Sequence, residues 1–212
     1  VVLGYDSTLP VTMDQLVTIA SAVRRGAPKV FLIGDMPFMS YHVSNAEAVR
    51  NAGRFMAEAG CDGVKVEVDE RMADVVEAIA RAGIPVMAHL GFKPQRVAMH
   101  GGYRIQGKTA TAAEAMASQA RAMVAAGAAM VLLEMTPPEA ARRVVEAVEV
   151  PVIGCGAGPH VDGHVVVMHD MVGLNDRPTP RFVPHHAAIG EALRGAFEVY
   201  VGSIASGAYP GP

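Results

Sequence analysis

The chain has 212 residues, of which 51% are apolar and 18% charged, and its formal net charge is −3. That length is enough for one sizeable hydrophobic core. The mild negative charge and the lack of a basic run argue against a protein that binds nucleic acid or an anionic membrane. Its two cysteines exclude a disulfide framework and favour a reducing compartment. No apolar run is long enough for a membrane span and no signal peptide is evident, so we expect a cytoplasmic protein.

Short apolar runs alternate with helical patterns along most of the chain. The start is strand-like, and a helix then begins at Thr12, with Gln15 at the capping-box position. Strands are predicted over 29–35, 62–67, 84–89, 129–134, 150–158 and 164–170. Helices are predicted over 45–60, 72–83, about 111–126, 138–148 and about 186–201.

This alternation predicts βαβ units and a parallel sheet, either open and doubly wound or closed as a barrel. An open sheet places its ligand mainly at one switch point. Here polar residues end several strands: Asp35, Glu67, His89 and Glu134. Many strands contributing to one rim favour a (β/α)₈ barrel. Only six of eight strands are found, so we expect one barrel domain over 1–212 whose first two βα units lie upstream of Val1.

Lys65 and Glu67 are two residues apart on one predicted strand, so their side chains point to the same side. Val64 and Val66 then face the helices, which places the charged pair in the barrel interior near its mouth. The alternative is a structural ion pair that plugs the barrel.

Asp35 ends the strand one βα unit before Glu67, so the two carboxylates can converge. Hard cations such as Mg²⁺ prefer oxygen ligands and often use only one or two protein carboxylates. The two residues therefore predict a magnesium site. The alternative for Asp35 is a turn or a helix cap before Met36 and Pro37.

Two further strand ends carry candidate groups. His89 could donate a hydrogen bond to a substrate oxygen, or it could be a hydrogen-bonded rim histidine. Glu134 lies in an apolar wall, away from the metal and from Lys65, which would raise its pKa and suit a general base. It could instead cap the next helix, but Thr136 before Pro137 is the better N-cap.

With these residues in place, the chain resembles the ketopantoate hydroxymethyltransferase family. The matching runs, in order, are VVLGYDSTLPVT, AVRRGAP, GDMPFMSY, EAVRNAGRFMAEAGCDGVKVE, GIPVMAHLGFKPQ, GGYRIQGKT, LLEMTPPEAA, VPVIGCGAG and DGHVVVMHDMVGL. Together they cover nearly the whole chain. The resemblance implies a barrel of the phosphoenolpyruvate/pyruvate superfamily, commonly a homodecamer. It also implies transfer of a hydroxymethyl group from 5,10-methylenetetrahydrofolate to 3-methyl-2-oxobutanoate, in pantothenate and coenzyme A synthesis.

The resemblance also implies a role for each candidate residue. Asp35 would bind Mg²⁺ and contact the substrate, and Glu67 would belong to the metal shell. Lys65 would bind the keto acid, and His89 would contact it. Glu134 matches the catalytic base.

Two departures from the family pattern concern the metal site. The family's Gly-Asp-Ser motif, whose Asp is another metal ligand, would precede Val1. Val68-Asp69 stand where the family usually has two glycines, so we expect a different loop beside the metal. Two other functions stay open: a superfamily carbon–carbon lyase or mutase acting on a 2-oxo acid, and a non-catalytic, ring-forming paralogue.

Overall fold

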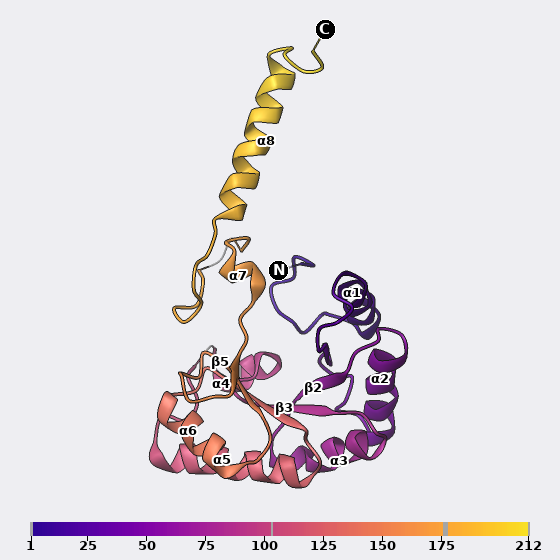
Figure 1. The fold of residues 1–212 in the computed structure, drawn as a ribbon, viewed down its shortest axis with the longest axis vertical. Coiled ribbons are helices and arrows are strands. Elements are labelled where there is room, and N and C mark those ends of the chain that lie inside the picture. Colours follow the sequence, from indigo (N-terminus) through magenta and orange to yellow (C-terminus); the bar gives the residue numbers. More distant parts are fainter. Residues whose placement is uncertain (1, 103, 176–177, 212) are drawn as a thin grey trace. The chain divides into compact units, whose positions relative to one another are not determined.

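The computed structural model describes residues 2–102, 104–175 and 178–211 (Figure 1). The chain divides into two compact units, which are described separately. One unit is Tyr5–Val165, and the other combines Val1–Gly4 with Val166–Pro212. The single barrel domain expected over 1–212 stays a prediction.

The Tyr5–Val165 unit is built on one six-stranded, all-parallel sheet. Its strands are β1 (Ile33–Asp35), β2 (Gly63–Glu67), β3 (Val86–Gly91), β4 (Met130–Glu134), β5 (Val152–Cys155) and β6 (Gly163–His164). They are paired in chain order, β1 to β6, with every neighbouring pair parallel. A doubly wound sheet reverses its strand order at a switch point, whereas a barrel wall keeps chain order. The described sheet is therefore part of a barrel wall, as predicted.

Helices cover the outside of this wall. They are α1 (Met13–Gly26), α2 (Asn45–Ala57), α3 (Ala73–Arg81), α5 (Ala110–Ala125) and α6 (Pro138–Ala147). Figure 1 shows α2, α3, α5 and α6 along the outer side of the strands. Short turns η1 (Glu70–Met72), η2 (Pro94–Arg96) and α4 (Val97–His100) follow β2 and β3. The capping box predicted at Thr12 and Gln15 is present at the start of α1.

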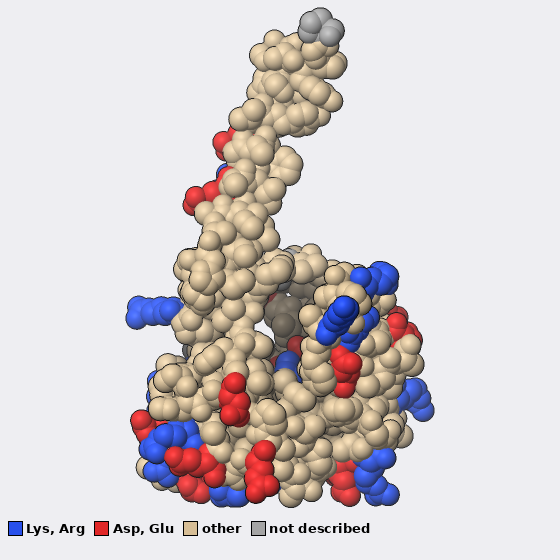
Figure 2. Space-filling view, in the orientation of Figure 1, with Lys and Arg blue, Asp and Glu red and all other residues tan. Residues whose placement is uncertain are grey.

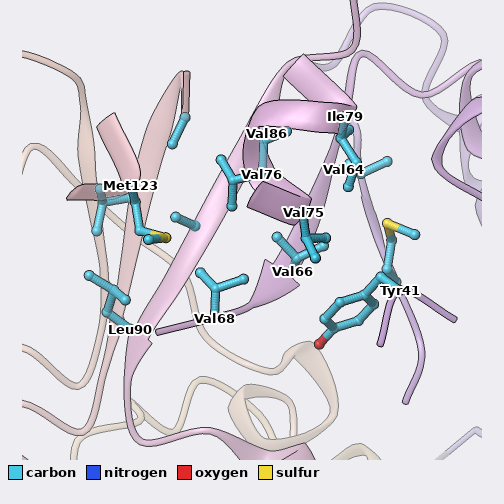
Figure 3. Packing of buried hydrophobic residues seen from close by; sticks show 14 of the residues in the cluster. Tyr41, Val64, Val66, Val68, Val75, Val76, Ile79, Val86, Leu90 and Met123 are labelled. Carbon is cyan, nitrogen blue, oxygen red and sulfur yellow. The ribbon is translucent and has the colours of Figure 1, made fainter. Parts of the chain in front are cut away.

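The hydrophobic core lies between the sheet and these helices. Val64 and Val66 of β2 are fully buried and belong to the same cluster as Val75 and Ile79 of α3. Figure 3 shows the two β2 valines directed toward that cluster. The predicted alternation of side chains along β2 is therefore confirmed. Lys65, which lies between the two valines, faces the other side of the sheet.

Two local predictions are wrong. Residues 2–9 form turns and bends rather than a strand. The strand predicted over 164–170 ends at His164, which pairs with Gly154 of β5. One more bond joins the Val165 N–H to the Gly154 carbonyl, and the chain then turns into α7 (Met168–Met171).

The second unit contains α7 and the long helix α8 (Ile189–Ala205). α8 is the helix predicted over about 186–201, with its bounds shifted toward the C-terminus. Figure 2 shows charged side chains of both signs spread over the Tyr5–Val165 unit, whereas α8 is mostly uncharged. No helix among the described residues is both long enough and apolar enough to cross a membrane.

Candidate functional site

The five predicted site residues lie on four neighbouring strands, near their carboxyl ends. Asp35 ends β1, Lys65 and Glu67 lie on β2, His89 lies on β3 and Glu134 ends β4. The register places Asp35 beside Lys65, and Glu67 beside His89. The structure thus brings all five together at one rim of the sheet, which is where barrel enzymes place their chemistry.

Direct contacts connect these side chains in a row. Lys65 Nζ lies 2.8 Å from Asp35 Oδ1 and 3.3 Å from His89 Nδ1. His89 Nδ1 also lies 4.0 Å from Glu67 Oε1. On the other side of the ring, His89 Nε2 lies 3.3 Å from Glu134 Oε2. His89 is therefore the link between the charged cluster and Glu134.

The protonation of His89 follows from its neighbours. Burial, together with the positive charges of Lys65 and Lys93, holds the pKa of His89 well below its usual range, so the ring is neutral near pH 7. The Lys65 ammonium has only donors, so Nδ1 accepts and the ring proton is on Nε2. Within the described part of the chain, Nε2 has no hydrogen-bond partner although it is buried. The site thus holds a buried donor ready for a ligand oxygen.

The two glutamates have raised pKa values. Burial is the main cause for both, and it raises the pKa of Glu67 and of Glu134 to about 7. Lys65 opposes burial in both cases. The raised pKa predicted for Glu134 is confirmed, but the residue is not isolated from Lys65 as expected. Burial also disfavours the charge on Lys65, but the carboxylates of Asp35 and Glu67 outweigh it and raise the lysine pKa.

Two buried residues that the sequence did not single out hold Glu67 in place. The Gln95 backbone N–H donates to Glu67 Oε2 at 3.0 Å, and the Gln95 side chain donates to the Met36 carbonyl at 2.9 Å. Tyr41 donates to Gln95 Oε1 at 2.8 Å and accepts from the Glu67 N–H at 3.1 Å. These bonds join the end of β2 to the segments that follow β1 and β3. No local sequence signal marks these residues, because their bonds are long-range.

The backbone around Glu134 is tightly constrained. Gly91 has φ +81°, and a Cβ there would lie 2.4 Å from the Glu134 carbonyl oxygen. Thr136 Oγ1 donates to the same carbonyl at 3.1 Å. The N-cap predicted for Thr136 is wrong, because α6 has Pro137 as its N-cap and no side-chain capping bond. The Glu134 side chain does not cap α6 either, so its carboxylate can take part in the candidate site.

The donor set suits a hard divalent cation. Asp35 and Glu67 supply carboxylate oxygens, and the ion pair with Lys65 engages only Oδ1 of Asp35. The negative charge of Asp35 contributes to the raised pKa of Glu67, and a cation between the two would relieve that repulsion. Among the described residues no three or more His, Cys, Asp or Glu side chains form a metal-holding group. Two carboxylates with water and substrate are nevertheless a common Mg²⁺ shell.

Comparisons with known proteins show the family of the chain. The family described as ketopantoate hydroxymethyltransferase matches residues 1–212. The chain is 46% identical over 212 residues to 3-methyl-2-oxobutanoate hydroxymethyltransferase of Heliobacterium modesticaldum, and 48% identical to that of Syntrophobacter fumaroxidans. These alignments cover 100% of this chain and 77% and 75% of the two relatives.

Solved structures support the fold. A phosphonopyruvate hydrolase matches with a TM-score of 0.58 and 14% identity, over 93% of this chain and 68% of that one. A putative phosphonomutase from Burkholderia cenocepacia matches with a TM-score of 0.53 and 17% identity, over 68% and 62%. At these identities the likeness concerns the fold alone, and it confirms the partial (β/α)₈ barrel. From the family match and the curated relatives, the chain belongs to the ketopantoate hydroxymethyltransferase family.

Proposed function

We propose that this protein transfers a hydroxymethyl group from 5,10-methylenetetrahydrofolate to 3-methyl-2-oxobutanoate, which gives 2-dehydropantoate. The observation that carries the proposal is the pairing of Glu134 with His89. A buried carboxylate with a pKa of about 7 lies 3.3 Å from a neutral imidazole whose Nε2–H is unpaired among the described groups. A base beside a free donor suits proton abstraction from the carbon next to a carbonyl group.

Each side chain then has one task. Glu134 removes the C3 proton of the keto acid, and its pKa near neutrality lets it accept a proton and release it again. The Nε2–H of His89 donates to a substrate oxygen. Lys65, whose pKa is raised, remains an ammonium and balances the substrate carboxylate. C3 then forms a bond to the methylene carbon of the folate. That carbon separates from both folate nitrogens, water supplies the hydroxyl group of the product, and tetrahydrofolate is released.

Asp35 and Glu67 would hold Mg²⁺, with Gln95 and Tyr41 fixing the position of Glu67. When bound, the ion supplies a Lewis acid that polarises the keto group and lowers the cost of removing the C3 proton. By family resemblance we further propose that the protein works in the cytoplasm as a homo-oligomer.

The test is exchange of the C3 proton of 3-methyl-2-oxobutanoate for deuterium, followed by NMR in D₂O with Mg²⁺, with and without tetrahydrofolate. Glu134→Gln keeps the size and hydrogen-bonding capacity of the side chain but removes the base. Exchange should fall by about 10²-fold or more, the range expected for loss of a general base. Binding of the keto acid should remain.

Glu139→Gln is the matched control, because Glu139 is an exposed residue of α6 that pairs with Arg142 on the surface. Its exchange rate should equal that of the unmodified protein. Unchanged exchange in Glu134→Gln would remove Glu134 from the role of base. Exchange that never occurs, even with tetrahydrofolate present, would instead favour a lyase or a non-catalytic protein.

A further inference from the structure

A cavity of about 380 Å³ lies in the Tyr5–Val165 unit, among η1, the segment after β3, and α5. That volume lies within the range of small-molecule sites in proteins. Its apolar lining includes Ala112, Ala115 and the buried Met116 of α5. None of the five residues assigned above to the reaction lines it. The cavity therefore adjoins these five residues without including them, and the charge of Lys93 acts on both Glu67 and His89.

Lys93 is the unusual residue of this lining. The residue is only 7% exposed, but its ammonium is not among the fully buried atoms, so it reaches the cavity, and it has no hydrogen bond or ion pair with the residues that the structure describes. Burial, with the positive charge of Arg96 nearby, lowers the pKa of Lys93. An ammonium at the wall of a partly enclosed cavity, without a carboxylate partner, favours an anionic ligand there.

The carboxylates that act on Lys93 are those of Asp69, Glu67 and Glu70, and together they do not outweigh burial and the charge of Arg96. Asp69 is 8% exposed and accepts from both Arg71 and Arg96, so its single negative charge is already shared by two guanidinium groups. Glu70 is exposed to solvent, where water screens its charge. The lining thus carries three positive and two negative side chains, one positive charge in excess.

We propose that this cavity binds a small organic anion, whose carboxylate or phosphate group pairs with the Lys93 ammonium. The two arginines held by Asp69 add to the positive potential, and Met116 with the two alanines accommodates the apolar part of the ligand. The site uses Asp69, one of the two residues that depart from the family pattern. The proposal is independent of the hydroxymethyl transfer.

The test observes the methyl group of Met116 by NMR in protein labelled with ¹³C-methyl methionine, with Met116→Leu identifying its signal. Inorganic phosphate and acetate are the two probes, titrated separately up to about 50 mM because single-charge contacts commonly give millimolar affinities. Lys93→Met removes the charge and keeps most of the stem. Lys29→Met, at an exposed lysine, is the matched control.

We expect the Met116 signal to shift in the unmodified protein and in Lys29→Met, with affinity at least tenfold weaker in Lys93→Met. A shift with phosphate alone would show that the cavity binds a phosphate group, and a shift with acetate alone would show that it binds a carboxylate group. A second variant, Ala115→Phe, keeps every charge but fills the cavity, and it should also lose binding. No shift with either probe, or undiminished affinity in Lys93→Met or Ala115→Phe, would overturn the proposal.

Discussion

Replacing Glu134 by glutamine is expected to stabilise the protein while it removes the proposed activity. In the folded protein the pKa of Glu134 is about 7, compared with an ordinary value of 4.5, and burial is the main cause. Ionising this side chain therefore costs more free energy in the folded state than in the unfolded chain. Glutamine fills the same space, can still face His89 Nε2, and never carries the charge.

The two pKa values determine the size and the pH range of the effect. A pKa raised from 4.5 to about 7 corresponds to about 3 kcal/mol. Below pH 4.5 the glutamate is protonated in both states, so its contribution to stability is fully present. That contribution is lost as the pH rises through 7. Above pH 7, Glu134→Gln should therefore be more stable than the unmodified protein by up to about 3 kcal/mol.

Urea unfolding of both proteins, measured from pH 5 to pH 9 without added metal, gives the free-energy difference directly. The difference should grow with pH and level off above about 7, while Glu139→Gln should show no such trend. A constant difference, or an unmodified protein that is the more stable at pH 8, would refute the argument that burial raises this pKa.

The proton-exchange rate of the unmodified protein should rise with pH and level off above about 7, because the carboxylate of Glu134 is the base; a flat rate from pH 5 to 9 would contradict this. Gly91→Ala should lower the unfolding free energy by about 1–3 kcal/mol, since its Cβ would clash with a carbonyl at positive φ; an unchanged urea midpoint would disprove the clash. Tyr41→Phe leaves the Glu67 amide and Gln95 Oε1 without their buried partner and should cost about 1–3 kcal/mol. Equal unfolding curves would show that water replaces the hydroxyl.

The fold could be predicted where local pattern and tertiary structure agree. The runs that became β2 and β4 are short and each alternates with a helical pattern. Each strand begins one residue later than predicted and ends at the predicted residue. The apolar run Val165–Val167 has the same appearance, but it leaves the sheet after β6. Strand formation there depends on a partner, and the sequence of the run itself does not show whether one is available.

The site could be predicted in part, namely the residues at the strand ends. Strand-end residues such as Asp35 and Glu134 were found because parallel strands bring their carboxyl ends to one rim. Tyr41 and Gln95 were not found, since they lie outside the strands, in the loop after β1 and in η2, and acquire their roles through partners far away in the sequence. The unpaired Lys93 was also missed, because only packing shows that a lysine is buried.

The short length of β1 has a consequence for the motions of the site. β1 has three residues, whereas β4 has five and pairs on both sides, with β3 and β5. The Asp35 side chain is 54% exposed and that of Glu134 is 19% exposed. Local opening begins where few buried contacts and few hydrogen bonds hold a segment. Amide hydrogens near Asp35 should thus exchange with solvent sooner than those near Glu134, so that the Asp35 end of the proposed site loosens while the Glu134 end stays formed.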